Sequence, residues 1–359
     1  MIAINMMSSA TKIKGQGVGS AYMEQMNLME RQLYNRFVFT ENFSGRQALI
    51  QHYHTVDAGH YWNCMLHKNR CVSVGSVHFL PETVDTSLNL PKPARWFFYK
   101  YLISFYKMMD FLVVVNPTFI PKLQAYGIPR EKIQYIPNYV SEENFYAMSE
   151  EEKRRMRRKY GVKETAFTVL GVGQLQTRKG VMDFVEIARR MPQIQFVWAG
   201  GFSFKGMTDG YREIKAIVEH PPANVTFLGI VDREKMNEVY NLADVMFLPS
   251  FEELFPMAIL ESMSCQIPIL LRDLDIYPEI LGGYYTAGTD VDSFIREIAR
   301  LREDREYYRT CSQAAACGHE FYSARHVAEI WEEFYQRAYH ALAEKKARQV
   351  RMKQNIGEV

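Results

Sequence analysis

The sequence has no uncharged hydrophobic run of the length, about 20 residues, that a membrane-spanning helix needs. Cysteine is also scarce, with five among 359 residues and no CxxC pair. This excludes a disulfide framework and a cysteine-rich zinc site, and it predicts reduced thiols in a cytoplasmic protein. The first residues, MIAINMMSSATK, lack a basic segment followed by a long apolar stretch, so we expect no signal peptide.

A large net charge is absent too. The chain has 43 Lys and Arg against 41 Asp and Glu, a net charge of +2. Such a balance does not favour nucleic acid as a partner, and any site for an anion must be local. Hydrophobic residues make up 47% of the chain and charged residues 23%, which is typical of a globular protein. The length suffices for two domains, each with its own core.

The C-terminal half has short apolar runs that alternate with segments of helical periodicity. Continuous apolar strands between helices predict a parallel sheet that is covered on both faces, the doubly wound α/β arrangement. The runs that predict strands are FTVLGVG, QFVWAGG, NVTFLGIV, DVMFLPS and IPILLRD, and helices are expected in VMDFVEIARRM, YREIKAIVEH and REKMNEVYNLA.

The N-terminal half repeats this pattern less regularly. Strands are expected at IAINMMS, FVFT, ALIQHYH, CVSVGSVHF, FLVVV and KIQYIP, and helices over most of 18–33, 57–69, 93–109 and 117–126. Two such domains in series predict two Rossmann-like sheets that face each other across a cleft. Ligands of open α/β sheets bind at the carboxyl ends of the strands, so the loops there should carry the chemistry.

A change of composition separates the two halves. Residues 138–160 are polar and charged, and Ser149 with Glu152 has the spacing of a capping box at a helix start. We therefore expect domains at 1–150 and 151–320. Residues 321–359 should form a long C-terminal helix with a basic tail, which packs back toward the first domain.

The stretch PSFEELFPMAILESMSC, residues 249–265, has glutamates on both sides of an apolar run. It should connect two strands, with Glu253 in the loop and Pro256 in the first turn of a helix. Free amides from Met257 onward would hold a phosphate. Glu261, about 7.5 Å further along the helix, could accept from both hydroxyls of a ribose, and Glu253 from those of a sugar. The alternative is that the two glutamates cap the helix or form salt bridges, and that the apolar residues between them are plain core.

This stretch resembles the glutamate-x7-glutamate motif of glycosyltransferase family 4, whose members are retaining enzymes of the GT-B fold. GVGQLQTRKGVMDFVEIARRM resembles the family's segment with a donor-binding lysine, here Lys179, and YIPNYVSEENF and YPEIL resemble two further landmarks. The similarity covers most of 110–345. KGQGVGSAY and VHFLPETV look most like bacterial enzymes that extend membrane glycolipids.

The resemblance implies transfer of a hexose from a UDP-sugar. Gln174 stands where many members carry arginine, so neutralising the diphosphate would depend on Lys179 and Arg178, with Gln174 donating hydrogen bonds. The loop from Phe255 to Met257, together with His78, would meet the sugar hydroxyls and choose between galactose and glucose. We expect galactose, added to a glucosyl-diacylglycerol, and no metal requirement. Asp273 and Asp275 in RDLD are interpreted as a polar loop.

The glycine-rich segment KGQGVGS precedes the first expected helix. By resemblance, backbone amides near Gly17 and Val18 would face the reacting sugar and the leaving diphosphate. A dinucleotide site with Glu41 on the ribose is an alternative, although the loop is long for that fingerprint, and glycines that serve helix packing are another. His78 could equally be a core histidine. His52 and His54 share one strand face and are interpreted as structural.

The segment PKPARWFFYKYLISFYKMMD, residues 91–110, combines cations with aromatic residues at helical spacing. Such a helix suits an anionic membrane surface, and the alternative is a buried helix with a solvated lysine edge. The cationic run at 153–161 is ordinarily a solvated face. We therefore expect a peripheral enzyme at the inner face of the cell membrane. A polysaccharide or protein acceptor, or a non-catalytic partner subunit of the same fold, are the other interpretations.

Overall fold

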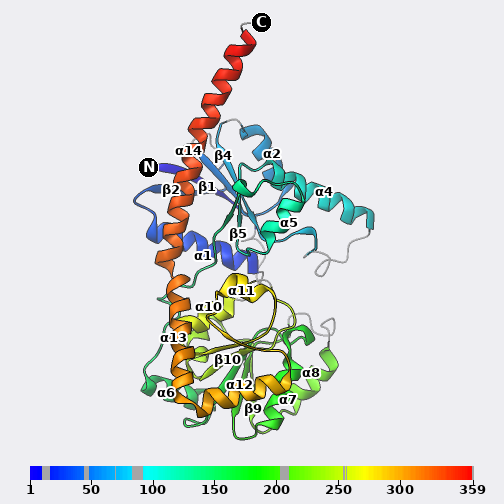
Figure 1. The fold of residues 1–359 in the computed structure, drawn as a ribbon, viewed down its shortest axis with the longest axis vertical. Coiled ribbons are helices and arrows are strands. Elements are labelled where there is room, and N and C mark those ends of the chain that lie inside the picture. The colour runs from blue at the N-terminus through cyan, green and yellow to red at the C-terminus, as the bar shows by residue number, and fades with distance from the viewer. Residues whose placement is uncertain are drawn as a thin grey trace. The chain divides into compact units, whose positions relative to one another are not determined.

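The computed structural model describes residues 1–9, 17–43, 48–68, 70–82, 92–202, 210–253, 255 and 257–357, with backbone alone at 17–21, 92 and 348–357. The chain forms two compact units (Figure 1). Unit 1 comprises Met1–Asn138 together with Ala324–Val359, and unit 2 comprises Tyr139–Ser323. Among the described helices, none has the length and hydropathy that crossing a bilayer requires.

Unit 1 contains a sheet of six parallel strands in the order β2-β1-β3-β4-β5-β6. The strands are β1 (Ile2–Met7), β2 (Phe37–Glu41), β3 (Ile50–Tyr53), β4 (Val72–Val77), β5 (Phe111–Val114) and β6 (Ile133–Tyr135). The helices are α1 (Gly17–Gln32), α2 (Ala58–His67), α4 (Lys92–Met108), α5 (Phe119–Ala125) and α14 (Ala324–Gly357), with a short 3-10 turn at Arg130–Lys132. Every strand predicted for this half is present.

The C-terminal helix α14 belongs to unit 1 because its side chains complete that core. The buried hydroxyl of Tyr335 lies 2.7 Å from Nδ1 of His52 on β3. Further along the helix, Nζ of Lys345 lies 2.7 Å from a carboxylate oxygen of Asp110, which precedes β5. A buried aromatic residue and a partly buried ion pair thus fix this helix against the sheet.

Unit 2 contains a second sheet of six parallel strands, in the order β12-β11-β10-β7-β8-β9. The strands are β7 (Thr168–Val172), β8 (Gln195–Ala199), β9 (Val225–Gly229), β10 (Val245–Leu248), β11 (Ile269–Arg272) and β12 (Thr286–Gly288). The helices are α6 (Glu150–Lys159), α7 (Val181–Arg190), α8 (Tyr211–Glu219), α9 (Met236–Asn241), α10 (Met257–Ser264), α11 (Ile276–Leu281), α12 (Val291–Glu303) and α13 (Arg305–Phe321), with 3-10 turns at Thr177–Lys179 and Arg233–Lys235. The strand order reverses between β7 and β10, where ligands of this architecture bind.

Helices cover both faces of the sheet of unit 2. Alternate residues of one strand therefore enter two different cores: Leu170 packs into one hydrophobic cluster, while its neighbour Val169 packs into the other. Met246 and Phe247 of β10 divide in the same way. This confirms the doubly wound α/β arrangement that the continuous apolar strands predicted.

The segment that enters unit 2 is held by side-chain hydrogen bonds. The amides of Tyr146 and Met148 donate to the side-chain oxygens of Asn237 and Asn241, at 3.0 and 2.8 Å. The structure therefore assigns residues 139–149 to unit 2, whereas the sequence placed the domain boundary at 150. The predicted capping box of Ser149 is confirmed at the start of α6.

Candidate functional site

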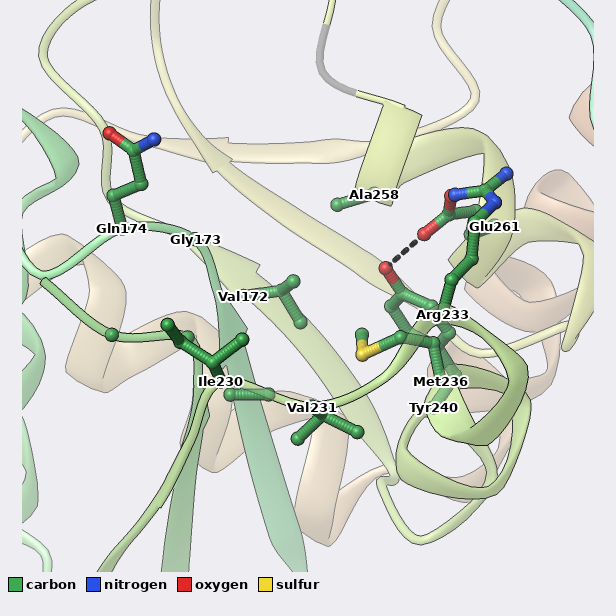
Figure 2. A pocket seen from close by; sticks show the side chains of 13 residues that line it. Val172, Gly173, Gln174, Ile230, Val231, Arg233, Met236, Tyr240, Ala258 and Glu261 are labelled. Atoms are coloured by element: carbon green, nitrogen blue, oxygen red, sulfur yellow. Dashed lines mark hydrogen bonds and ion pairs between the residues drawn. The ribbon is translucent and has the colours of Figure 1, made fainter. Parts of the chain in front are cut away.

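A cavity of about 380 Å³ opens at the carboxyl edge of the sheet of unit 2 (Figure 2). It lies at the reversal of strand order, since the loop after β7 forms one side and helix α10, which follows β10, forms another. Its lining residues are Val172, Gly173, Gln174, Ala199, Gly200, Gly201, Ile230, Val231, Arg233, Met236, Tyr240, Ala258 and Glu261. The walls are mostly apolar, with a few polar groups at the α10 side, as is typical of small-molecule sites.

Glu261 is the buried acid of this cavity. Its carboxylate accepts a hydrogen bond of 2.5 Å from the hydroxyl of Tyr240 and one of 2.8 Å from the guanidinium of Arg233, which converge on it in Figure 2. Burial, and then the adjacent carboxylate, raise the pKa of Tyr240 well above its usual value, so the hydroxyl stays protonated and donates. The carboxylate is held in one orientation before any ligand arrives.

The partners of Glu261 differ in their freedom to move. Tyr240 is fully buried, whereas the side chain of Arg233 is 47% exposed. Water can solvate the exposed guanidinium when it leaves, whereas the buried carboxylate oxygen then needs another donor. One oxygen of Glu261 is thus fixed by the protein, and the other can change its partner.

Glu253 and Lys179 form a second pair in unit 2. Nζ of Lys179 donates to a carboxylate oxygen of Glu253 at 2.5 Å, and the two side chains are 14% and 6% exposed. The loops that carry them are fixed to each other, since the amide of Phe251 donates to the carbonyl of Arg178 at 2.8 Å. The structure therefore brings these two predicted residues together, as each other's partner.

The approach of these two loops depends on Gly180. This residue has φ +71°, in the left-handed region, and a Cβ there would meet the carbonyl oxygen of Pro249 at 2.3 Å. A larger residue would push the loop of Lys179 away from the loop of Glu253. The glycine after the lysine is therefore a geometric requirement of the pair.

Gln174 and Arg178 belong to a short polar chain beside the cavity. The side-chain oxygen of Gln174 accepts from Gln176 at 2.6 Å, and Nε of Arg178 donates to Gln176 at 2.9 Å. Gln174 also lines the cavity (Figure 2), whereas Arg178 is exposed. Both predicted residues thus lie on the loop that ends at Lys179.

The start of helix α10 borders the same cavity through Ala258. Met257 is the first described residue of the helix, and it packs against the core together with Phe255, whose ring meets that of Tyr322 edge to face at 6.2 Å. Pro256 lies outside the described residues. The amides at this helix start are those that the sequence assigned to a phosphate.

The remaining predicted site residues belong to unit 1. Gly17 and Val18 are the first residues of α1, and their side chains lie outside the described part of the structure. His78 follows β4 at the carboxyl edge of that sheet; burial lowers its pKa to about 4, and its Nε2 has no hydrogen-bond partner among the described residues. A neutral imidazole is therefore present at this edge.

Sequence reasoning missed Arg233 and Tyr240. They approach Glu261 from the preceding crossover, across 28 and 21 residues of sequence. Together with Met236 they have the spacing i, i+3 and i+7, which places them on one face of a helix. The available signal was a pair of polar residues, Arg233 and Tyr240, on one helical face in the crossover before the glutamate motif.

The described acidic, histidine and cysteine side chains do not form a recognisable metal site. Among the described residues, no group of three or more His, Cys, Asp or Glu side chains could hold a metal ion. Asp273 and Asp275, the formal Asp-x-Asp pair, are both exposed, and Asp275 is the N-cap residue of α11. The expectation that no metal is required stays a prediction.

Comparison with known proteins identifies the family of this chain. Residues 152–316 match the family described as "Glycosyl transferases group 1". The alpha-galactosylglucosyldiacylglycerol synthase of Streptococcus pneumoniae is 44% identical over 336 residues, which cover 94% of this chain and 90% of that protein. The processive diacylglycerol alpha-glucosyltransferase of Acholeplasma laidlawii is 30% identical over 183 residues, about half of each chain.

Solved structures agree on the architecture. HepE of Anabaena, solved in complex with UDP, superposes with a TM-score of 0.74 at 15% identity and covers 94% of this chain and 100% of that one. The sucrose-phosphate synthase of Thermosynechococcus elongatus gives a TM-score of 0.72 at 16% identity, with 95% and 100% covered. The resemblance found in the sequence is confirmed: the chain belongs to the group 1 glycosyl transferases and is a glycosyltransferase of the GT-B fold.

Proposed function

We propose that this enzyme transfers a hexose from a UDP-sugar to a membrane glycolipid such as a glucosyl-diacylglycerol, with retention of the anomeric configuration. The observation that carries the donor part is the buried Glu261, held by Tyr240 and Arg233 in a cavity of about 380 Å³. That volume lies in the range of small-molecule sites. A fixed carboxylate beside a helix start matches a ribose next to a diphosphate.

In the proposed donor complex, the ribose diol donates to Glu261. Tyr240 keeps the carboxylate in place, while the exposed Arg233 gives up its position to the ribose hydroxyls. The diphosphate then lies at the amides of α10 near Met257 and Ala258, and its charge is balanced by Lys179 and Arg178. Stabilising the charge that develops on the leaving diphosphate is the largest contribution that these groups can make.

The second glutamate orients the sugar. When the diphosphate draws Lys179 toward itself, Glu253 becomes free to accept from hydroxyls of the hexose and to fix its anomeric carbon. The acceptor oxygen forms the new glycosidic bond as the bond to the diphosphate breaks. A leaving phosphate oxygen takes the acceptor's proton, so neither glutamate forms a covalent bond and no metal ion is invoked.

The acceptor part of the proposal draws on unit 1. The Streptococcus pneumoniae relative, named as a glycolipid synthase, supports a glycosyl-diacylglycerol acceptor and galactose as the donated sugar. The neutral Nε2 of His78, buried and without a partner among the described residues, is a suitable contact for a sugar hydroxyl. The backbone of Gly17 and Val18 is proposed to lie near the same sugar.

Helix α4 supports contact with a bilayer through its N-terminal half. Trp96 and Phe97 are 57% and 67% exposed, and Nζ of Lys100 lies 5.8 Å from the Trp96 ring. The C-terminal half is buried, since Phe105 is 1% exposed. The aromatic residues of this helix therefore do not form one membrane face, because Trp96 and Phe105, nine positions apart, lie on opposite sides.

Helix α2 adds exposed apolar groups next to α4. Tyr61 of α2 stacks on Tyr101 of α4 at 5.3 Å, and Trp62 and Leu66, one helical turn apart, are 64% and 74% exposed. Exposed tryptophan beside lysine suits the interface of an anionic membrane. All five cysteines are free thiols, which is typical of proteins in the reducing cytoplasm. We therefore place the enzyme in the cytoplasm, at the inner face of the membrane.

Product analysis tests the proposal. The purified chain is given membrane lipid extract with UDP-glucose or UDP-galactose in separate reactions, and the lipids are examined by mass spectrometry and by NMR of the new anomeric proton. We expect a hexose added to a glycosyl-diacylglycerol, from UDP-galactose in preference, with an α linkage. Transfer to a soluble polysaccharide or peptide, with lipids unchanged, would contradict the acceptor part and leave the donor part standing.

A further inference from the structure

A second cavity, of about 720 Å³, opens at the other edge of the sheet of unit 2. Phe167 and Asp244, which immediately precede β7 and β10, line it together with the start of α6 and the corner between α12 and α13. We propose that this cavity is a binding site for an organic phosphate, that is, a phosphate group carried on an apolar or aromatic moiety. Nothing in the proposed glycosyl transfer uses it.

The lining of the cavity includes three apolar or aromatic residues that are held by contacts with one another. The rings of Phe167 and Tyr308 meet edge to face with centroids 6.5 Å apart, and Leu301 lies beside them. The hydroxyl of Tyr308 donates to the carbonyl of Asp244 at 3.1 Å, which fixes the ring. Aromatic rings of this kind offer contact area to the carbon part of a ligand.

The rim of the cavity carries three arginine side chains that have no direct acidic partner in the described part of the chain. The side chains of Arg302, Arg305 and Arg309 are exposed, and none of these side chains forms an ion pair or hydrogen bond with another residue in the described part of the chain. They converge from the end of α12 and the first turns of α13. Guanidinium groups present pairs of N–H donors that match phosphate oxygens, so three of them at one rim favour that anion.

The other cations near this cavity are already paired. Arg157 lies 2.7 Å from the carboxylate of Asp244, and Lys153 lies 3.0 Å from Glu150. The two acids that line the cavity therefore have their own partners, and its three arginines are without a direct one among the described residues. Guanidinium groups beside the rings of Phe167 and Tyr308 favour an anion with an apolar part over a bare one.

This site is separate from the cavity of Glu261. Strands β7 and β10 run parallel from one edge of the sheet to the other, so residues before them and residues after them lie at opposite ends. The five residues of β7 alone span about 17 Å. Binding here therefore does not depend on the proposed donor site, and the two can be tested independently.

Isothermal titration calorimetry of the full chain with phenyl phosphate and with inorganic phosphate, at constant ionic strength and both without UDP and with UDP in excess, tests the proposal. We expect phenyl phosphate to bind more tightly than inorganic phosphate. The double variant R305A/R309A should weaken the binding of phenyl phosphate at least about tenfold. The control R154A/R155A removes two exposed cations of α6 that do not line the cavity, and it should bind as the wild type does.

Circular dichroism confirms that both double variants are folded. Equal weakening in the two variants, loss of binding when UDP is added, or no heat from phenyl phosphate up to about 10 mM would overturn the proposal. Flotation with phosphatidylglycerol vesicles then distinguishes the sources of the phosphate. Weaker flotation of R305A/R309A alone assigns the group to a lipid headgroup, whereas unchanged flotation with weaker phenyl phosphate binding assigns it to a soluble ligand.

Discussion

The two units have the same architecture but different chemistry at the carboxyl edges of their sheets. In unit 1 this edge carries neutral groups: burial lowers the pKa of His52 to about 3 and that of His78 to about 4. In unit 2 it carries charges, the pair of Lys179 with Glu253 and the buried Glu261. Equal folds thus say little about function, which depends on the side chains at the strand ends.

The difference corresponds to the two substrates that we propose. A diphosphate needs cations and helix amides, whereas an uncharged sugar needs hydrogen-bonding groups that add no charge. In unit 1, Nε2 of His52 lies 2.9 Å from the hydroxyl of Ser76, and this hydroxyl lies 3.3 Å from Nδ1 of His54. The Nε2 atom of His54, like that of His78, has no hydrogen-bond partner within the described residues.

The charged edge is tested first by Lys179→Ala. We expect kcat to fall at least about 100-fold, about 3 kcal/mol, because a cation is removed from the developing charge of the diphosphate. Steady-state kinetics with the UDP-hexose measure it. Lys159→Ala is the matched control, since it breaks another Lys–Glu pair of unit 2, with Glu238, away from the cavity. Equal losses in both variants would place Lys179 outside the reaction.

Replacing the buried acid should act on donor affinity. Glu261→Ala should weaken UDP binding about 30-fold, about 2 kcal/mol, since a charged acceptor of two hydroxyls is lost. Tyr240→Phe should weaken it less, because the carboxylate remains and loses only its fixed partner. Calorimetry measures both, and a larger loss for Tyr240→Phe than for Glu261→Ala would contradict the assigned roles.

The neutral edge of unit 1 should make the protein sensitive to acid. The folded pKa of His52, about 3, lies below the usual 6.5, so the unfolded chain binds the extra proton and stability falls as pH drops below about 6.5. At pH 5 the loss from His52 is about 2 kcal/mol. Urea unfolding at pH 7 and 5 measures it, and His52→Gln should reduce the difference. His220→Gln, at an exposed site in unit 2, should leave the difference unchanged.

The smallest expected effect concerns the exposed aromatic residues of unit 1. The double variant W96S/F97S should bind anionic vesicles about tenfold more weakly, because two apolar side chains no longer enter the interface. Y34S/F43S removes two other exposed aromatic residues of unit 1 and serves as the control. If both double variants weaken flotation equally, α4 is not the membrane contact.

The strands and helices could be predicted because their signals are local. Continuous apolar runs identified β1 to β11, and the run after Pro256 identified α10. The strand β12 was missed, since its three residues, Thr286–Gly288, are too few and too polar to give a pattern. An element can be predicted from local periodicity only when it is long enough, by several residues, to show the pattern.

The contacts of the site could not be predicted, because they join distant segments. Arg233 and Tyr240 reach Glu261 from a different crossover, and Lys153 lines one cavity together with Arg305 and Arg309, about 150 residues further along the chain. The packing of residues 139–149 with unit 2 could not be predicted either. The side chains that hold this segment, Asn237 and Asn241, lie about 90 residues further along the chain. Such pairings are products of the tertiary fold.

The central claim is that Glu261 holds the ribose of a uridine nucleotide at the charged edge of unit 2. Calorimetric titration of the wild type and of Glu261→Ala with UDP and with 2′,3′-dideoxy-UDP tests it most directly. We expect the wild type to bind UDP at least about tenfold more tightly than the dideoxy compound, and the variant to bind both equally. A wild type that does not distinguish them, or a variant that still does, would contradict the account.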